Sequence, residues 1–210
     1  MKRIFKTLVV AICLFSTTFS NAQCFQKHAM FLDLGFGLGI YNTTVYNYTD
    51  KTTKTGKAGS FIVPLSFEYA LGNRIGIGLQ LVSQSFLSRK DSTSNSTPTA
   101  HSGELNVFGN YHFYCSDHTD IYAGLTIGGS NFTYNANNDK ATTLSAGGPY
   151  VDIHCDARFL FGNHFGMLAS IRFPTTIYVQ GLATDNTGNE VNFDLKLRGT
   201  IIGTGFTYKF

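Results

Sequence analysis

Cysteine and proline are scarce in this sequence of 210 residues, which holds four of each and no tryptophan. Beyond the first 22 residues, which we expect to be removed, three cysteines remain: Cys24, Cys115 and Cys155. Because three is an odd number, at most one intramolecular disulfide can form among them. The chain is therefore not a disulfide-stapled scaffold, and which two cysteines pair stays open.

A charge excess is also missing from the mature chain. The full sequence has 16 Lys and Arg against 13 Asp and Glu, and the first 22 residues contribute three of the basic residues, Lys2, Arg3 and Lys6. Removing them leaves 13 basic residues against 13 acidic ones. Binding to nucleic acid needs a basic surface on the mature domain, so we expect no nucleic-acid partner.

The first 22 residues have the features of a secretory signal peptide. Lys2, Arg3 and Lys6 are followed by a short apolar stretch over residues 8–15 and then by Ser20-Asn21-Ala22. The apolar stretch is too short for a membrane-spanning helix, and the small residues suit a cleavage site. We expect cleavage after Ala22, which leaves residues 23–210 as one domain.

Helical periodicity is absent from the mature chain, and alternation at period two takes its place. The clearest example is the stretch 60–81, where two alternating segments flank the turn Gly72-Asn73. Two alternating runs around a two-residue turn of this type predict a β-hairpin. We expect eight such strands, near residues 28–41, 60–71, 74–81, 102–114, 120–134, 147–161, 164–177 and 191–210.

Short turns and long polar segments alternate between the expected strands. The long segments cover residues 42–59, 88–100, 135–144 and 180–190. Alternation of short turns with longer loops is typical of outer-membrane barrels. With eight strands, both termini and the three short turns lie on one rim, and the four long loops lie on the other.

The apolar faces of these strands are too rich in large residues to fit inside the barrel. An eight-stranded barrel has an interior only just wide enough to be filled by side chains. The opposite faces carry small residues that suit a narrow lumen, namely Gly35, Gly37, Gly39, Gly76, Gly78, Gly124, Gly128, Gly148 and Gly166. The apolar faces therefore point outward, where they require lipid. The fold class is all-β, an eight-stranded antiparallel up-and-down transmembrane β-barrel.

Charged residues of both signs fall on the inward faces. They form an expected lumen charge network of Asp33, Glu68, Glu104, Asp152, His154, Asp156, Arg158, Arg172, Asp194, Lys196 and Arg198. We expect pairing among them, because an unpaired charge in the lumen would be costly unless water reaches it.

Two positions disturb the alternation. Pro64 lies inside a strand, where proline removes a ladder hydrogen bond, so we expect a bulge or bend there. In the last strand the apolar residues are odd-numbered up to Ile201 and even-numbered from Phe206. A bulge between Ile202 and Phe206, where glycine is frequent, would turn Phe206 toward lipid.

The signal peptide, the eight strands and the ending Gly-Phe-Thr-Tyr-Lys-Phe together resemble OmpA/OmpX-type outer-membrane β-barrels. The Asn-Ala-Gln start of the mature chain is similar to starts common in the Bacteroidetes. The resemblance covers residues 23–210. It implies that the terminal aromatic residues Phe206, Tyr208 and Phe210 are an assembly signal for the barrel-assembly machinery.

Two clusters suggest chemistry, and each has a simpler explanation. Asp152, His154 and Asp156 share one inward face, but no nucleophile is tied to them by sequence, so we interpret them as structural charges. His112, Cys115 and His118 are spaced three apart, but they converge on a metal only if the turn curls. We therefore predict no catalytic residue, no cofactor and no metal.

The leading function is a non-enzymatic outer-membrane barrel with a structural role, or with loops that bind an unknown surface ligand. Its other partners would be outer-membrane lipid and the assembly machinery. We expect the short turns and both termini to be periplasmic. A narrow porin-like channel is the alternative, and a lipid A-modifying enzyme is a third possibility.

Overall fold

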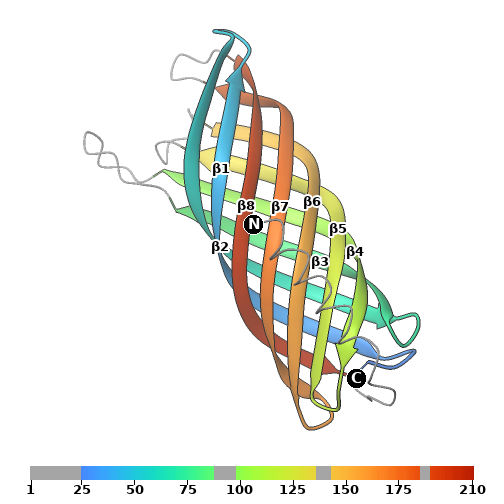
Figure 1. Ribbon diagram of the computed structural model, residues 1–210. Helices are drawn as coiled ribbons and strands as arrows, with labels where there is room; N and C mark the ends of the chain where they lie inside the picture. Colours follow the sequence, from blue (N-terminus) through green and yellow to red (C-terminus); the bar gives the residue numbers. More distant parts are fainter. Residues whose placement is uncertain (1–24, 88–97, 136–142, 185–189) are drawn as a thin grey trace, which may run out of the picture.

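The computed structural model describes residues 25–87, 98–135, 143–184 and 190–210, which form one closed antiparallel barrel (Figure 1). The expected signal peptide lies outside the described residues. The strands are β1 Met30–Asn47, β2 Thr52–Ala70, β3 Ile75–Leu87, β4 Thr99–Cys115, β5 Thr119–Asn135, β6 Thr143–Phe161, β7 Phe165–Thr184 and β8 Glu190–Lys209. In the described part of the chain, no helix is long and apolar enough to cross a membrane.

The barrel closes between the first and the last strand, as expected. β1 pairs with β8 from Phe31 opposite Lys209 to Asn47 opposite Phe193. The backbone N–H of Phe210 donates to the carbonyl of Met30 at 3.0 Å, so the end of the chain is tied to the rim where β1 begins. The short turns after β2, β4 and β6 lie on this same rim (Figure 1).

The strands extend further toward the other rim than the sequence suggested. Residues 42–59, expected as a loop, continue β1 and β2 as a paired hairpin with a turn at residues 48–51. Residues 88–97, 136–142 and 185–189, which belong to the other three expected loops, lie outside the described residues. β1 has 18 residues and β8 has 20, whereas about 9–11 residues are enough to cross a membrane.

An apolar belt covers the outside of the half that contains the short turns, and the predicted outward faces are confirmed there. Leu38 is 67% exposed on β1 and Ile202 is 67% exposed on β8, although both are large aliphatic residues. Exposed large apolar residues of this belt occur on all eight strands, including Phe61, Leu79, Leu105, Leu125, Ile153 and Phe173. A contiguous band of this kind requires a lipid environment.

In the half nearer the long connections, the polarity of the two faces is reversed. Here an apolar cluster fills the lumen, consisting of Tyr41, Ile62, Val82, Ala100, Phe132, Ala146, Tyr178, Phe193, Leu195, Leu197 and Ile201. The outward face carries polar residues such as Asn42, Ser83, His101, Asn131 and Thr200. This half therefore has the apolar interior and polar exterior of a water-soluble barrel.

The expected bulge in β8 is wrong. The pairing of β8 with β1 runs without a shift through Ile202, Gly203, Thr204, Gly205 and Phe206, and its pairing with β7 is regular there too. Phe206 does point outward, as expected, but for another reason. Even-numbered residues face outward along the described length of β8, and the change at Ile201 reflects the change of surroundings from water to lipid.

Three residues of the expected lumen charge network are therefore misplaced. Asp194, Lys196 and Arg198 face outward in β8, and their neighbours Phe193, Leu195 and Leu197 point into the lumen. The prediction failed because it assumed that the apolar face of a strand always meets lipid. In the water-exposed half the apolar face is the inner one.

Pro64 interrupts pairing without shifting the register. β1 and β2 pair at Leu34 with Leu65 and again at Gly37 with Ile62, with the intervening pairs missing. Of the expected bulge or bend, the unchanged register excludes the bulge. Pro64 still pairs with Val82 of β3, and its ring lies so close to Gly35 that an added Cβ there would be 2.8 Å from its Cγ. Glycine at position 35 thus makes room for the proline ring.

The boundary of the lipid belt can be tested on β3. Leu79 and Ser83 both face outward, Leu79 within the belt and Ser83 above it. We expect Leu79→Arg to destabilise the folded barrel by about 2–4 kcal/mol and Ser83→Arg by about 0–1 kcal/mol. Reversible unfolding by denaturant from phospholipid vesicles measures both values. Equal losses would place the two positions in the same environment and contradict the assigned boundary.

Candidate functional site

The guanidinium of Arg158 is the centre of a fully buried ion-pair network in the lumen. Its Nη2 donates to Asp33 Oδ2 at 2.6 Å and to Glu68 Oε2 at 2.5 Å, while Nη1 donates to Asp120 Oδ2 at 3.3 Å. Arg158, Glu68 and Asp120 have no exposed surface, and Asp33 is 4% exposed. Three strands, β1, β2 and β5, thus supply the carboxylates that surround one arginine of β6.

His112 joins the same network through both ring nitrogens. Nε2 is 3.0 Å from Glu68 Oε1, and Nδ1 is 2.7 Å from Asp120 Oδ1. Both ring nitrogens of His112 therefore have a carboxylate oxygen within hydrogen-bonding distance. His112 and Arg158 together face three carboxyl groups, those of Asp33, Glu68 and Asp120.

Aromatic rings enclose the network. The guanidinium carbon of Arg158 is 4.4 Å from the ring centroid of Phe31 and 4.5 Å from that of Tyr122, so the cation lies between two rings. Phe25 stacks on His112 with centroids 3.4 Å apart, and its side chain is 1% exposed. Phe25, Phe31, Ala70 and Leu160 form an apolar cluster that covers the network at the short-turn rim.

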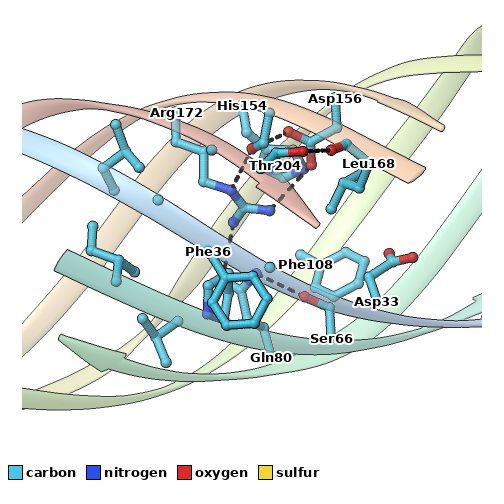
Figure 2. A pocket seen from close by; sticks show the side chains of 18 of the residues that line it. Asp33, Phe36, Ser66, Gln80, Phe108, His154, Asp156, Leu168, Arg172 and Thr204 are labelled. Carbon is cyan, nitrogen blue, oxygen red and sulfur yellow. Dashed lines mark hydrogen bonds and ion pairs between the residues drawn. The ribbon is translucent and has the colours of Figure 1, made fainter. Parts of the chain in front are cut away.

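Arg172 forms a second ion-pair cluster one layer deeper. Its Nη2 donates to Asp156 Oδ2 at 3.1 Å, and its Nη1 donates to Gln80 Oε1 at 3.2 Å and lies 3.5 Å from Asp152 Oδ2. Figure 2 shows Arg172 between Asp156 on one side and Gln80 on the other, with Gln80 bonded to Ser66. This cluster links β2, β3, β6 and β7 across the lumen.

Inward glycines provide the space for these side chains. A Cβ at Gly76 would lie 2.0 Å from Glu68 Oε1, and one at Gly124 would lie 2.1 Å from Asn110 Oδ1. Asn110 in turn donates to Glu68 Oε1 at 2.8 Å and contacts His154 Nε2 at 2.8 Å. The glycines on the inner face therefore leave the space that the larger polar side chains of the network occupy.

A small cavity in the lumen runs along both ion-pair clusters, where Arg158 and Arg172 line it, and reaches the apolar cluster. Its volume is about 30 Å³, and its walls include Glu104, Tyr41, Tyr150, Ile62 and Ile201. A cavity of this size holds about two water molecules. Gln84 lines this cavity, and its buried Nε2 has no hydrogen-bond partner in the protein, so it gives such a water a group to bind.

Eight residues of the expected lumen charge network lie on the lumen side. Arg158 binds Asp33 and Glu68, while Arg172 binds Asp152 and Asp156. His154 contacts Thr126 and Asn110 and lies 3.6 Å from Asp152. Glu104 is buried beside the cavity and is not one of the carboxylates that bind either arginine.

Sequence analysis missed the two members that complete the Arg158 cluster. His112 was considered only as a metal ligand and Asp120 only as the start of a strand, although both lie on the inward face. Among the described residues, no group of three or more His, Cys, Asp and Glu side chains is arranged to hold a metal. Cys115 is disulfide-bonded, and Cys155 is free and exposed on the outer face.

Comparison with solved structures shows the fold. OprG from Pseudomonas aeruginosa, an outer membrane protein, is 16% identical, covers 90% of this chain and 99% of its own, and superposes with a TM-score of 0.61. The outer membrane protein AlkL is 13% identical, covers 92% of this chain and 95% of its own, and has a TM-score of 0.56. No protein-family model and no curated protein sequence matches the chain. The fold is that of eight-stranded outer-membrane β-barrels.

The contribution of Arg158 can be measured by removing its charge. We expect Arg158→Met to destabilise the barrel by about 3–5 kcal/mol, because it leaves buried carboxylates without their cation. Denaturant unfolding followed by heat-modifiable gel migration measures the loss. Adding Glu68→Gln to Arg158→Met should recover part of the stability, since one orphaned charge is then gone. A double variant less stable than Arg158→Met would contradict this account.

Proposed function

We propose that this protein is a non-enzymatic barrel of a bacterial outer membrane with a sealed lumen. Its role is then structural, or it presents the water-exposed half and the connections above it to a surface partner. The observation that carries the proposal is the filling of the lumen by two different layers. One is the ion-pair network around Arg158 and Arg172, and the other is the apolar cluster of Tyr41, Phe193 and their neighbours.

A narrow porin-like channel is less consistent with these layers. An ion crossing the lumen would have to displace Arg158 from three carboxylates and two aromatic rings. It would then have to pass the apolar cluster, whose side chains fill the lumen between a few buried polar groups such as Gln84 and Ser130. The lumen cavity of about 30 Å³ is too small for a hydrated solute to rest in.

An enzymatic role is also less consistent with the geometry. In a catalytic triad, the carboxylate and the attacking hydroxyl bind opposite nitrogens of the histidine. Here the hydroxyl of Thr126 and the carboxylate of Asp152 both lie near Nδ1 of His154, at 3.3 Å and 3.6 Å. Nε2 is occupied by the amide oxygen of Asn110. Thr126 has no exposed surface, so a lipid substrate has no access to it.

The apolar belt supports the orientation that we propose. It lies in the half with the short turns, so the polar half projects from one side of the bilayer. Outer-membrane barrels have short periplasmic turns and longer extracellular loops. The short turns and both ends of the mature chain then face the periplasm, and the water-exposed half faces outward from the cell.

We expect the purified barrel to conduct no ions in planar bilayers, because both layers close the lumen. Single-channel recording measures this directly, with a porin of known conductance as the positive control. Heat-modifiable migration of the same sample confirms that the barrel is folded. Steady, reproducible conductance steps from the folded protein would refute the sealed lumen and favour the channel.

The end of the chain provides a test of assembly in cells. Phe210 is 58% exposed and follows the outward residues Phe206 and Tyr208 of β8. The rings of Tyr208 and Phe210 contact each other, with centroids 4.9 Å apart. We expect deletion of Phe210 to reduce the level of folded protein in the outer-membrane fraction severalfold. Phe210→Leu is the matched control, since it keeps an apolar end and the backbone bond to Met30. Normal membrane levels of the deletion variant would show that the terminal residue has no assembly role.

A further inference from the structure

The outward-facing charges of the barrel wall are gathered on one side. Among the strand residues whose side chains the structure describes, they are Lys57 on β2 and Asp194, Lys196 and Arg198 on β8. These two strands lie on either side of β1, so the charges flank one strand (Figure 1, where β8 is red and β1 is blue). At the same height, the outer faces of β3 to β6 carry uncharged residues and His101.

The strand register places the three basic residues around one point. Asn42 of β1 is paired with Lys57 on one side and with Arg198 on the other. Thr44, one pleat further along β1, is paired with Lys196. Neighbouring strands are about 4.8 Å apart, so the three cationic groups can reach a single anion over Asn42 and Thr44. We name Lys57, Lys196 and Arg198, with Asn42 and Thr44 between them, the basic patch.

The basic patch lies directly above the apolar belt. On β1, Ile40 lies two residues below Asn42 and is 70% exposed. On β8, Thr200 pairs with Ile40, and the outward Ile202 follows two residues later. Two residues of a strand span about 6.6 Å, which is the depth of the polar headgroup layer outside the hydrocarbon. The patch is therefore at the height where the phosphates of a lipid headgroup lie.

The cationic groups of the patch have no ion-pair partner among the described residues. Asp194, the acidic residue at its far end, accepts a hydrogen bond from the hydroxyl of Tyr48 at 2.8 Å. Arginine binds phosphate through two parallel N–H bonds and lysine binds it as a point charge. Asn42 and Thr44 add an amide and a hydroxyl that donate to phosphate oxygens.

We propose that the basic patch binds the phosphate groups of an anionic lipid in the outer leaflet, on the β8–β1–β2 side of the barrel. The lipid's acyl chains then lie along the apolar belt below it, against Leu38, Ile40 and Ile202. This inference rests on the orientation under the proposed function. It assigns the barrel a preferred lipid neighbour and therefore a preferred side within the membrane.

The experiment measures lipid retained by the purified, folded barrel in detergent, using native mass spectrometry with added diphosphoryl lipid A. We expect the triple variant Lys57→Gln, Lys196→Gln, Arg198→Gln to retain it about tenfold less than the unchanged protein. The matched control is Lys27→Gln, Lys51→Gln, Arg74→Gln, which removes the same charge from exposed positions outside the patch. It should retain lipid A as the unchanged protein does.

Three outcomes would overturn the proposal. The patch variant could retain as much lipid as the unchanged protein, or both variants could lose it equally, which would assign the effect to net charge. Inorganic pyrophosphate at equal concentration could displace the lipid completely, which would assign the site to a soluble phosphate. Because binding is measured on purified protein, it is separate from cell fractionation, which tests whether the barrel lies in the outer membrane.

Discussion

Each strand of this protein has one face toward the lumen and one toward the outside of the barrel, and its residues must suit both. The rest of the structure depends on that constraint. Side chains alternate between the faces of a strand, and in a closed barrel one face always meets the narrow lumen. What the other face meets changes along the barrel axis, from lipid near the short turns to water near the long connections. In β8 the polarity of the two faces changes along the strand while its register with β1 continues without a shift.

The contents of the lumen follow from this division. In the lipid-embedded half the outward positions are apolar, and the inner positions carry the charges and glycines. These charges are buried from water, so they are stabilised by one another and by neutral side chains such as Asn110 and Gln80. Arg158 alone meets three carboxylates and two rings. In the water-exposed half the inner positions supply the apolar core that holds the strands together without lipid.

Much of this arrangement could be predicted from the sequence, because alternation determines which residues share a face. The closed barrel of eight strands, the outward belt and the inward position of Asp33, Glu68, Arg158 and Arg172 all follow from it. What alternation does not reveal is the medium on each side. The sequence therefore placed three charged residues of β8 in the lumen: Asp194, Lys196 and Arg198. It also predicted a loop over residues 42–59, because a polar stretch was not expected to form barrel wall that faces water.

The pairing partners within the lumen were beyond prediction for a different reason. Which carboxylate meets which cation depends on the stagger between strands distant in sequence, such as β1 and β6. His112 and Asp120 are eight residues apart, on two strands joined by a short turn, and they meet only because of the register between them. Periodicity in a single sequence gives the face of a residue but not its height along the barrel.

The position of the outward charges also bears on how the barrel is completed. Lys196 and Arg198 lie on β8 next to the junction with β1, which joins the two strands most distant in sequence and therefore carries the largest cost of loop closure. In the orientation that we propose, the polar half has to reach the far side of the bilayer, and charged side chains cross hydrocarbon only at high cost. Until β1 and β8 pair, Lys196 and Arg198 lie beside an open edge of the sheet rather than within a closed wall, so these charges need not cross a completed, lipid-covered surface.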